Sequence, residues 1–122
     1  MRKIKFRAKT LANGHWVYGN LVIRDKECVS IRNCKSEPWV DPKTVGQFTG
    51  LTDCNGKEIY EGDILQIFED ADSCNEFVKF KEGCFMTDDG YAEYSFVIID
   101  TSVRTVIGNI HDNPDLLKRG GR

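Results

Sequence analysis

The sequence lacks the long apolar segments that mark membrane proteins and secreted proteins. Its longest unbroken apolar run is four residues, from Phe96 to Ile99, whereas a membrane-spanning helix needs about 20. The opening residues, M-R-K-I-K-F-R, do not contain the apolar core of a secretory signal peptide. We therefore expect a cytoplasmic protein with no membrane segment.

Cysteine and histidine occur at spacings that match neither a disulfide framework nor a zinc site. The sequence has no C-x-x-C pair, five residues separate its two nearest cysteines, and only His15 and His111 could complete a zinc ligand set. We expect buried, reduced thiols and no metal or other cofactor. The five cysteines are Cys28, Cys34, Cys54, Cys74 and Cys84.

Helix-forming residues are scarce. Alanine, leucine and methionine together number 12, whereas the β-branched residues valine, isoleucine and threonine number 26. Because β-branched side chains suit a pleated sheet, this ratio favours an all-β fold. A chain of 122 residues has the length of one ordinary domain.

The first strands can be predicted from alternation. Ile4, Phe6 and Ala8 alternate with basic residues between Lys3 and Lys9, which is the period-two pattern of a half-buried strand. Asn13-Gly14 then predicts a tight turn, so residues 3–23 should form a β-hairpin. A third strand over residues 28–32 would complete a three-stranded meander.

The rest of the chain reads as short strands separated by turns. Pro38 and Pro42 predict a loop or an edge segment between residues 33 and 43. Later strands are expected over residues 64–68, 77–81, 84–87, 94–99 and 103–110, and Pro114 predicts a short C-terminal helix. Such close spacing favours a small β-barrel, as one closed barrel or as two sub-barrels meeting near residue 60.

Three segments of the sequence carry a family resemblance: R-K-I-K-F-R-A at the start, V-D-P-K-T-V-G-Q-F-T-G-L-T-D-C-N-G-K-E-I-Y-E-G-D-I from Val40 to Ile64, and V-I-G-N-I-H-D-N-P-D-L-L from Val106 to Leu117. Together they resemble the YopX family of phage and prophage proteins. The resemblance implies a single mainly β domain, residues 1–122, whose C-terminal part is similar to an SH3-like small barrel. It supplies no activity, cofactor or catalytic residue.

Two groups of polar residues could carry chemistry. Glu58, Glu61 and Asp63 could hold a divalent cation, or they could serve the backbone N–H groups of turns. His111-Asp112 is the closest acid–imidazole pair, but neighbours on a strand point to opposite faces, so the aspartate would not orient the imidazole. We therefore predict that the protein is not an enzyme.

The charge distribution points to binding. Residues 1–60 carry a net charge of +5 and residues 61–122 carry −7. We expect an interaction module that binds a phage or host protein, with salt-sensitive, heterologous contacts in any homo-oligomer.

The alternative function is nucleic-acid binding by the basic first strand, with aromatic side chains of the second strand as stacking surfaces. Two other interpretations compete with it. Lysines also protect edge strands from pairing with another chain, and the aromatic residues could belong to the core. The candidate residues are Lys3, Lys5, Arg7, Lys9, Trp16 and Tyr18.

Overall fold

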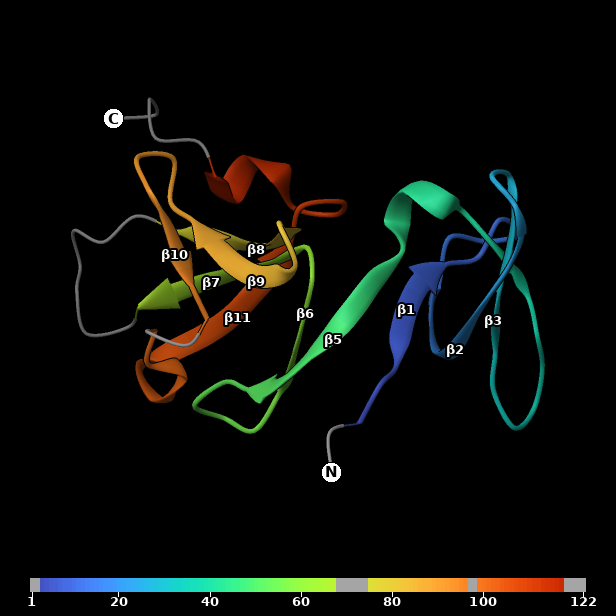
Figure 1. Cartoon of the computed structure of the whole chain (residues 1–122), viewed down its shortest axis with the longest axis horizontal. Helices are drawn as coiled ribbons and strands as arrows, with labels where there is room; N and C mark the ends of the chain where they lie inside the picture. Colours follow the sequence, from blue (N-terminus) through green and yellow to red (C-terminus); the bar gives the residue numbers. More distant parts are fainter. Residues whose placement is uncertain (1–2, 68–74, 97–98, 118–122) are drawn as a thin grey trace. The chain divides into compact units, whose positions relative to one another are not determined.

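The computed structural model describes residues 3–67, 75–96 and 99–117 and divides into two compact units, Met1–Gly50 (unit 1) and Leu51–Arg122 (unit 2). The described residues form antiparallel strands and three short 3₁₀ turns (Figure 1). The mainly β fold predicted from composition is therefore confirmed. No helix among the described residues has the length and apolar character needed to cross a membrane.

Unit 1 contains one antiparallel sheet in which the strands follow the order β4-β3-β2-β1-β5. Figure 1 shows β1, β2 and β3 side by side, which confirms the predicted meander. A 3₁₀ turn, η1, joins β4 to β5, and β5 continues into unit 2. The elements are β1 (Phe6–Lys9), β2 (Trp16–Asp25), β3 (Cys28–Arg32), β4 (Trp39–Val40), η1 (Pro42–Thr44) and β5 (Gly46–Thr52).

The β1–β2 hairpin has the turn that the sequence predicts. Gly14 adopts a positive φ of 73°, and its N–H donates to the Thr10 carbonyl at 2.9 Å. The Asn13 side chain accepts a hydrogen bond from the His15 N–H at 3.1 Å, as asparagine commonly does in turns. These contacts fix the register in which Ala8 faces Val17.

One side of the unit 1 sheet carries the core of that unit. The fully buried side chains come from three different strands and are joined by partly buried hydrophobic residues on β1, β2 and the β5 approach. Because side chains alternate along a strand, the residues between them point to the opposite side of the sheet. The core consists of Ala8, Val29, Ile31 and Val40, with Phe6, Val17, Leu21 and Val45 packed against it.

Unit 2 contains a second antiparallel sheet in the order β10-β9-β8-β7-β11, and β6 pairs with β5. Its core consists of Ile59, Leu65, Val78, Phe96 and Val106, with Phe85 and Ile99 packed against it. The elements are β6 (Glu58–Tyr60), β7 (Asp63–Ile67), β8 (Glu76–Lys81), β9 (Cys84–Asp88), β10 (Glu93–Ser95), η2 (Thr101–Val103), β11 (Arg104–Asn109) and η3 (Pro114–Leu117).

Asp53 hydrogen-bonds to β11, which lies at the edge of the unit 2 sheet. Its carboxylate accepts hydrogen bonds from the backbone N–H groups of Asn55 at 2.8 Å, Lys57 at 2.9 Å and Val106 at 2.9 Å. Burial on its own raises the pKa of Asp53, but these donors outweigh it, and the net pKa is lowered. The turn after β5 is therefore held on an edge strand by a charged side chain.

The predicted barrel is wrong for the described residues, because the two sheets are not closed. In unit 2, β10 and β11 lie at opposite edges of the sheet and are not paired with each other, so the SH3-like barrel implied for this part is not found. The predicted C-terminal helix is a single 3₁₀ turn, η3, since only the four residues from Pro114 to Leu117 adopt that conformation.

The prediction of buried thiols is also wrong. The four cysteines in the described ranges are free and exposed, and Cys74 lies outside those ranges. Cys28 and Cys84 begin strands next to tight turns, and Cys54 sits within one. Turns run over the protein surface, so these positions expose a side chain that is usually buried elsewhere.

Candidate functional site

The β1–β2 register gathers most of the predicted basic and aromatic residues on one surface. Arg7 pairs with Tyr18, and Lys9 pairs with Trp16. All four alternate with the core residues, so they occupy the side of the unit 1 sheet opposite the core. Lys3 precedes β1 and is exposed, so it lies outside this paired register.

The cations on β1 and just before it lie over aromatic rings. The guanidinium carbon of Arg7 is 4.6 Å from the centroid of the Trp16 ring, and Lys9 Nζ is 5.5 Å from the same centroid. Lys5 Nζ lies 5.6 Å from the centroid of Phe48 on β5. Cations at these distances are attracted to the negative faces of the rings. These contacts hold the positive charges next to the flat faces of aromatic rings.

Two competing interpretations of this pattern are excluded by the sheet. β1 lies between β2 and β5, so its lysines are not protecting an edge strand. Trp16 is half-buried and Tyr18 is 46% exposed, so neither ring belongs to the buried core. Arg7 differs from Tyr18, its partner on β2, because only 6% of Arg7 is exposed.

A second polar cluster lies on the same side of the sheet, on β2, β3 and the approach to β4. The Glu37 carboxylate accepts hydrogen bonds from Ser30 Oγ at 2.8 Å, Arg32 Nε at 3.0 Å and Arg24 Nη1 at 3.3 Å. The guanidinium carbon of Arg24 is also 5.4 Å from the centroid of the Trp39 ring. No sequence pattern indicates this cluster, since the prolines around it predict a loop.

The cluster holds its carboxylate strongly in the charged form. The hydrogen bonds from Ser30, Arg32 and Arg24 outweigh desolvation and lower the pKa of Glu37 to about 2. Glu37 is therefore ionised at neutral pH and neutralises part of the positive charge of the two arginines.

We call the surface formed by these side chains the cation–ring face. Its members in the regular β1–β3 register project from the side of the unit 1 sheet that faces away from the core, with Asn20 opposite Arg32 and Val22 opposite Ser30. Arg24, at the irregular end of β2, and Phe48, which is only 8% exposed, are included through their contacts with Trp39 and Lys5. The face consists of Lys5, Arg7, Lys9, Trp16, Tyr18, Arg24, Arg32, Trp39 and Phe48.

The charge division follows the unit boundary. Residues 1–50 contain ten Lys/Arg and four Asp/Glu, for a net charge of +6, and residues 51–122 contain seven and fifteen, for −8. The separation is sharper than the one obtained by dividing the sequence in half. Unit 1 is therefore the part of the molecule whose field attracts anions.

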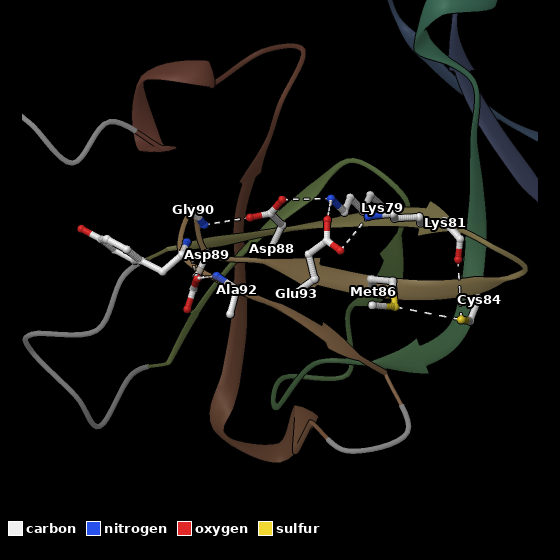
Figure 2. Close-up of polar contacts among 10 residues, drawn as sticks. Lys79, Lys81, Cys84, Met86, Asp88, Asp89, Gly90, Ala92 and Glu93 are labelled. Atoms are coloured by element: carbon white, nitrogen blue, oxygen red, sulfur yellow. Dashed lines mark hydrogen bonds and ion pairs between the residues drawn. The ribbon is translucent and has the colours of Figure 1, made fainter.

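Lysines in unit 2 are arranged differently. Lys79 Nζ is bonded to Glu93 and, at 3.0 Å, to Asp88, and Lys81 Nζ lies 2.9 Å from Glu93 (Figure 2). The hydrogen bonds from Lys79 and Lys81, with that of Lys79 contributing most, lower the pKa of Glu93. The hydrogen bond to Glu93 in turn raises the pKa of Lys79. These lysines tie β8 to β9 and β10.

Two of the three carboxylates named as possible cation ligands, Glu58 and Asp63, accept local hydrogen bonds. Asp63 is 1% exposed and accepts from the Tyr60 N–H at 2.7 Å, while Glu58 accepts from the Tyr60 hydroxyl at 3.0 Å. Among the described residues, no three His, Cys, Asp or Glu side chains are grouped as metal ligands.

The His111-Asp112 segment is part of a turn. The His111 N–H donates to the side-chain oxygen of Asn109 at 3.0 Å, and the Asp112 carboxylate accepts from the Asn109 amide at 3.1 Å. Both residues follow β11 rather than lie within it. Nothing in the described part of the chain indicates catalysis.

Comparisons with known proteins agree with this fold. A crystal structure of protein EF1440 from Enterococcus faecalis matches with a TM-score of 0.66 and 21% identity, covering 97% of this chain and 100% of that chain. At that identity the similarity shows the fold alone. No curated protein matches the chain. The model of a family described as YopX protein matches residues 5–118, so the chain belongs to the YopX family.

Proposed function

We propose that this protein is a binding module whose ligand is single-stranded nucleic acid, held by the cation–ring face of unit 1. The observation that carries the proposal is the register of β1 and β2, in which Arg7 pairs with Tyr18 and Lys9 with Trp16. That register puts positive charge and aromatic rings on one side of an interior strand.

The spacing of this face suits an extended nucleic-acid strand. Alternate residues of a β-strand are about 6.7 Å apart, which is close to the separation of successive phosphates in an extended single strand. Lys5, Arg7 and Lys9 occupy three such positions along the chain. Aromatic rings beside a basic track provide stacking surfaces for unpaired bases, as in other single-strand binders. The net charge of +6 on unit 1 supports the same assignment.

The biological setting belongs to the same proposal. A YopX-family protein of this kind would act as an accessory protein of a phage or prophage in the host cytoplasm. Its role would be to bind, without carrying out chemistry on its ligand.

Binding can be tested by fluorescence anisotropy with labelled 20-nucleotide DNA and RNA of mixed sequence, single-stranded and duplex. We expect single strands to bind more tightly than duplex, and we expect the affinity to fall as salt increases because counterions are released. Tyr18→Ser should weaken single-strand binding by about 5- to 150-fold, the range for losing one stacked base.

A matched control is available in unit 2. Tyr91 is 77% exposed, so Tyr91→Ser removes the same side chain from the acidic unit. It should leave the affinity unchanged. No binding of any single strand at 50 mM salt would contradict the proposed function, as would equal losses in the two serine variants.

A second candidate function, association with a protein, is favoured by the charge division between units. With +6 on one unit and −8 on the other, unit 1 of one copy complements unit 2 of the next. Such head-to-tail association would weaken as salt rises. Sedimentation velocity at 50 and 500 mM salt tests this, and a mass independent of salt contradicts it.

A further inference from the structure

We propose that Ser30, Arg24 and Arg32 form a phosphate-binding subsite on β2 and β3 that Glu37 occupies in the free protein. This inference rests on the proposed function and identifies a second anion position on the cation–ring face. A nucleic-acid phosphate would take the place of the Glu37 carboxylate, so Glu37 acts as a built-in competitor that lowers affinity.

The donor set is one that binds phosphate as well as carboxylate. Both Glu37 oxygens are engaged, Oε1 by Arg32 Nε and Oε2 by Ser30 Oγ and Arg24 Nη1. A phosphate diester likewise presents two anionic oxygens, and arginine recognises such pairs through its planar array of N–H groups. The Ser30 hydroxyl, in a residue only 1% exposed, fixes one donor in place.

The subsite is open to a ligand despite its occupant. The side chains of Arg24 and Arg32 are 51% and 57% exposed, and that of Glu37 is 28% exposed. Glu37 lies between β3 and β4, beside a turn that Asn33 closes by accepting from the N–H groups of Lys35 at 2.8 Å and Ser36 at 2.9 Å. Rotation of the glutamate side chain alone would vacate the donors, with no change in that turn.

The position of the subsite fits the track of one ligand. Tyr18 and Asn20 point to the same side of β2, and Asn20 pairs with Arg32 on β3. Neighbouring strands lie about 4.8 Å apart, so a nucleic-acid strand that follows β1 and then turns across β2 to β3 advances about 10 Å after the turn. That distance corresponds to one or two nucleotide steps. Trp39, which is 49% exposed and lies beside Arg24, offers a further ring at the end of this path.

The experiment compares Glu37→Gln with Glu27→Gln in the anisotropy assay, using single-stranded 20-mers at several salt concentrations. Glu27 is exposed and lies in the β2–β3 turn, so its substitution makes the same charge change in the same unit without touching the donors. We expect Glu37→Gln to bind several-fold more tightly than Glu27→Gln. Its salt slope should steepen by about 0.7 for each phosphate newly contacted, because single strands release about that many counterions per contact.

A third variant tests whether the gain in affinity of Glu37→Gln depends on the Arg32 donor. Adding Arg32→Gln to Glu37→Gln should abolish the extra affinity and the extra slope, whereas Arg32→Gln in the wild-type background should change both less. Melting curves of each variant establish that it is folded before its binding is interpreted.

The outcomes separate this inference from the proposed function. If the wild-type protein binds single strands but Glu37→Gln and Glu27→Gln have equal affinities and slopes, the phosphate subsite is wrong and the proposed function stands. If the wild-type protein and both glutamine variants fail to bind at 50 mM salt, both proposals are wrong.

Discussion

The two units use their charged side chains for different purposes. In unit 1, Lys5, Arg7 and Lys9 lie over aromatic rings on the side of the sheet opposite the core. In unit 2, Lys79 and Lys81 bond to carboxylates of neighbouring strands, and this network ties the strands together. These cations of unit 1 thus lie beside aromatic rings in a unit with a net charge of +6, whereas the lysines of unit 2 lie beside carboxylates in a unit with a net charge of −8. The net charge identifies unit 1 as the unit that attracts an anionic ligand.

The same difference applies to one carboxylate in each unit. Asp53 in unit 2 is 6% exposed and holds the edge of β11, so its role is structural. Glu37 in unit 1 is bonded mainly to exposed arginine side chains on a surface. Asp53→Asn should therefore affect folding, whereas Glu37→Gln should affect binding.

The largest expected effect is on the folding of unit 2. Asp53→Asn removes the charge that accepts three backbone N–H groups, and we expect a loss of about 3 kcal/mol in the free energy of unfolding. Urea unfolding monitored by circular dichroism measures this loss. Glu37→Gln in the same assay should shift the midpoint much less; similar shifts would contradict the contrast between a structural and a surface carboxylate.

The Asp53 contribution should also depend on pH in a defined direction. Its pKa is lower in the folded protein than the ordinary value of 3.8, so the folded state favours the ionised form. The stabilisation is complete above the unfolded pKa and is lost as the pH falls through the lower folded value. Wild type should therefore lose stability relative to Asp53→Asn below about pH 4, and a constant difference down to pH 2 would contradict this.

The next largest expected effect is on single-strand binding when lysines of each unit are replaced. The double variants Lys5→Gln/Lys9→Gln and Lys79→Gln/Lys81→Gln each remove two positive charges, one pair from each unit. We expect the unit 1 pair to weaken single-strand binding on the order of tenfold and to reduce the salt slope by about 1.4, for two lost phosphate contacts. The unit 2 pair should change the slope little. Equal changes would mean that only the net charge of the protein matters.

The smallest expected effect concerns the thiols. The charge of Asp25 raises the pKa of Cys28, which lowers the fraction of reactive thiolate. Asp25→Asn should accelerate alkylation of Cys28 by a few-fold at pH 8, as measured by mass spectrometry of the labelled peptide. Alkylation of Cys84, in the other unit, provides the control and should keep its rate. A Cys28 rate that does not rise would show that Asp25 does not control this thiol.

Local patterns in the sequence are sufficient to predict the first three strands of unit 1. Alternation around Phe6 and Ala8 identifies the buried side, and Asn13-Gly14 locates the turn. The loop spans residues 11–14, so the register that pairs Arg7 with Tyr18 and Lys9 with Trp16 comes from the structure.

Features that depend on long-range pairing were not predictable in the same way. Whether a sheet closes depends on its edge strands meeting, and alternation within a strand carries no information about that. The Glu37 cluster depends on the pairing of Ser30 with Trp39, in a segment whose prolines indicate a loop. The cysteines were predicted to be buried from the usual behaviour of the residue type, but Cys28 and Cys84 adjoin turns.

The exposed thiols offer a route to the arrangement of the molecule. Cys28 is in unit 1 and Cys84 is in unit 2, and both are free. With the other cysteines replaced by serine, a pair of spin labels at these sites would report the distance between the units in solution by pulsed electron paramagnetic resonance. Repeating the measurement with an oligonucleotide added would show whether ligand binding at one unit moves the other.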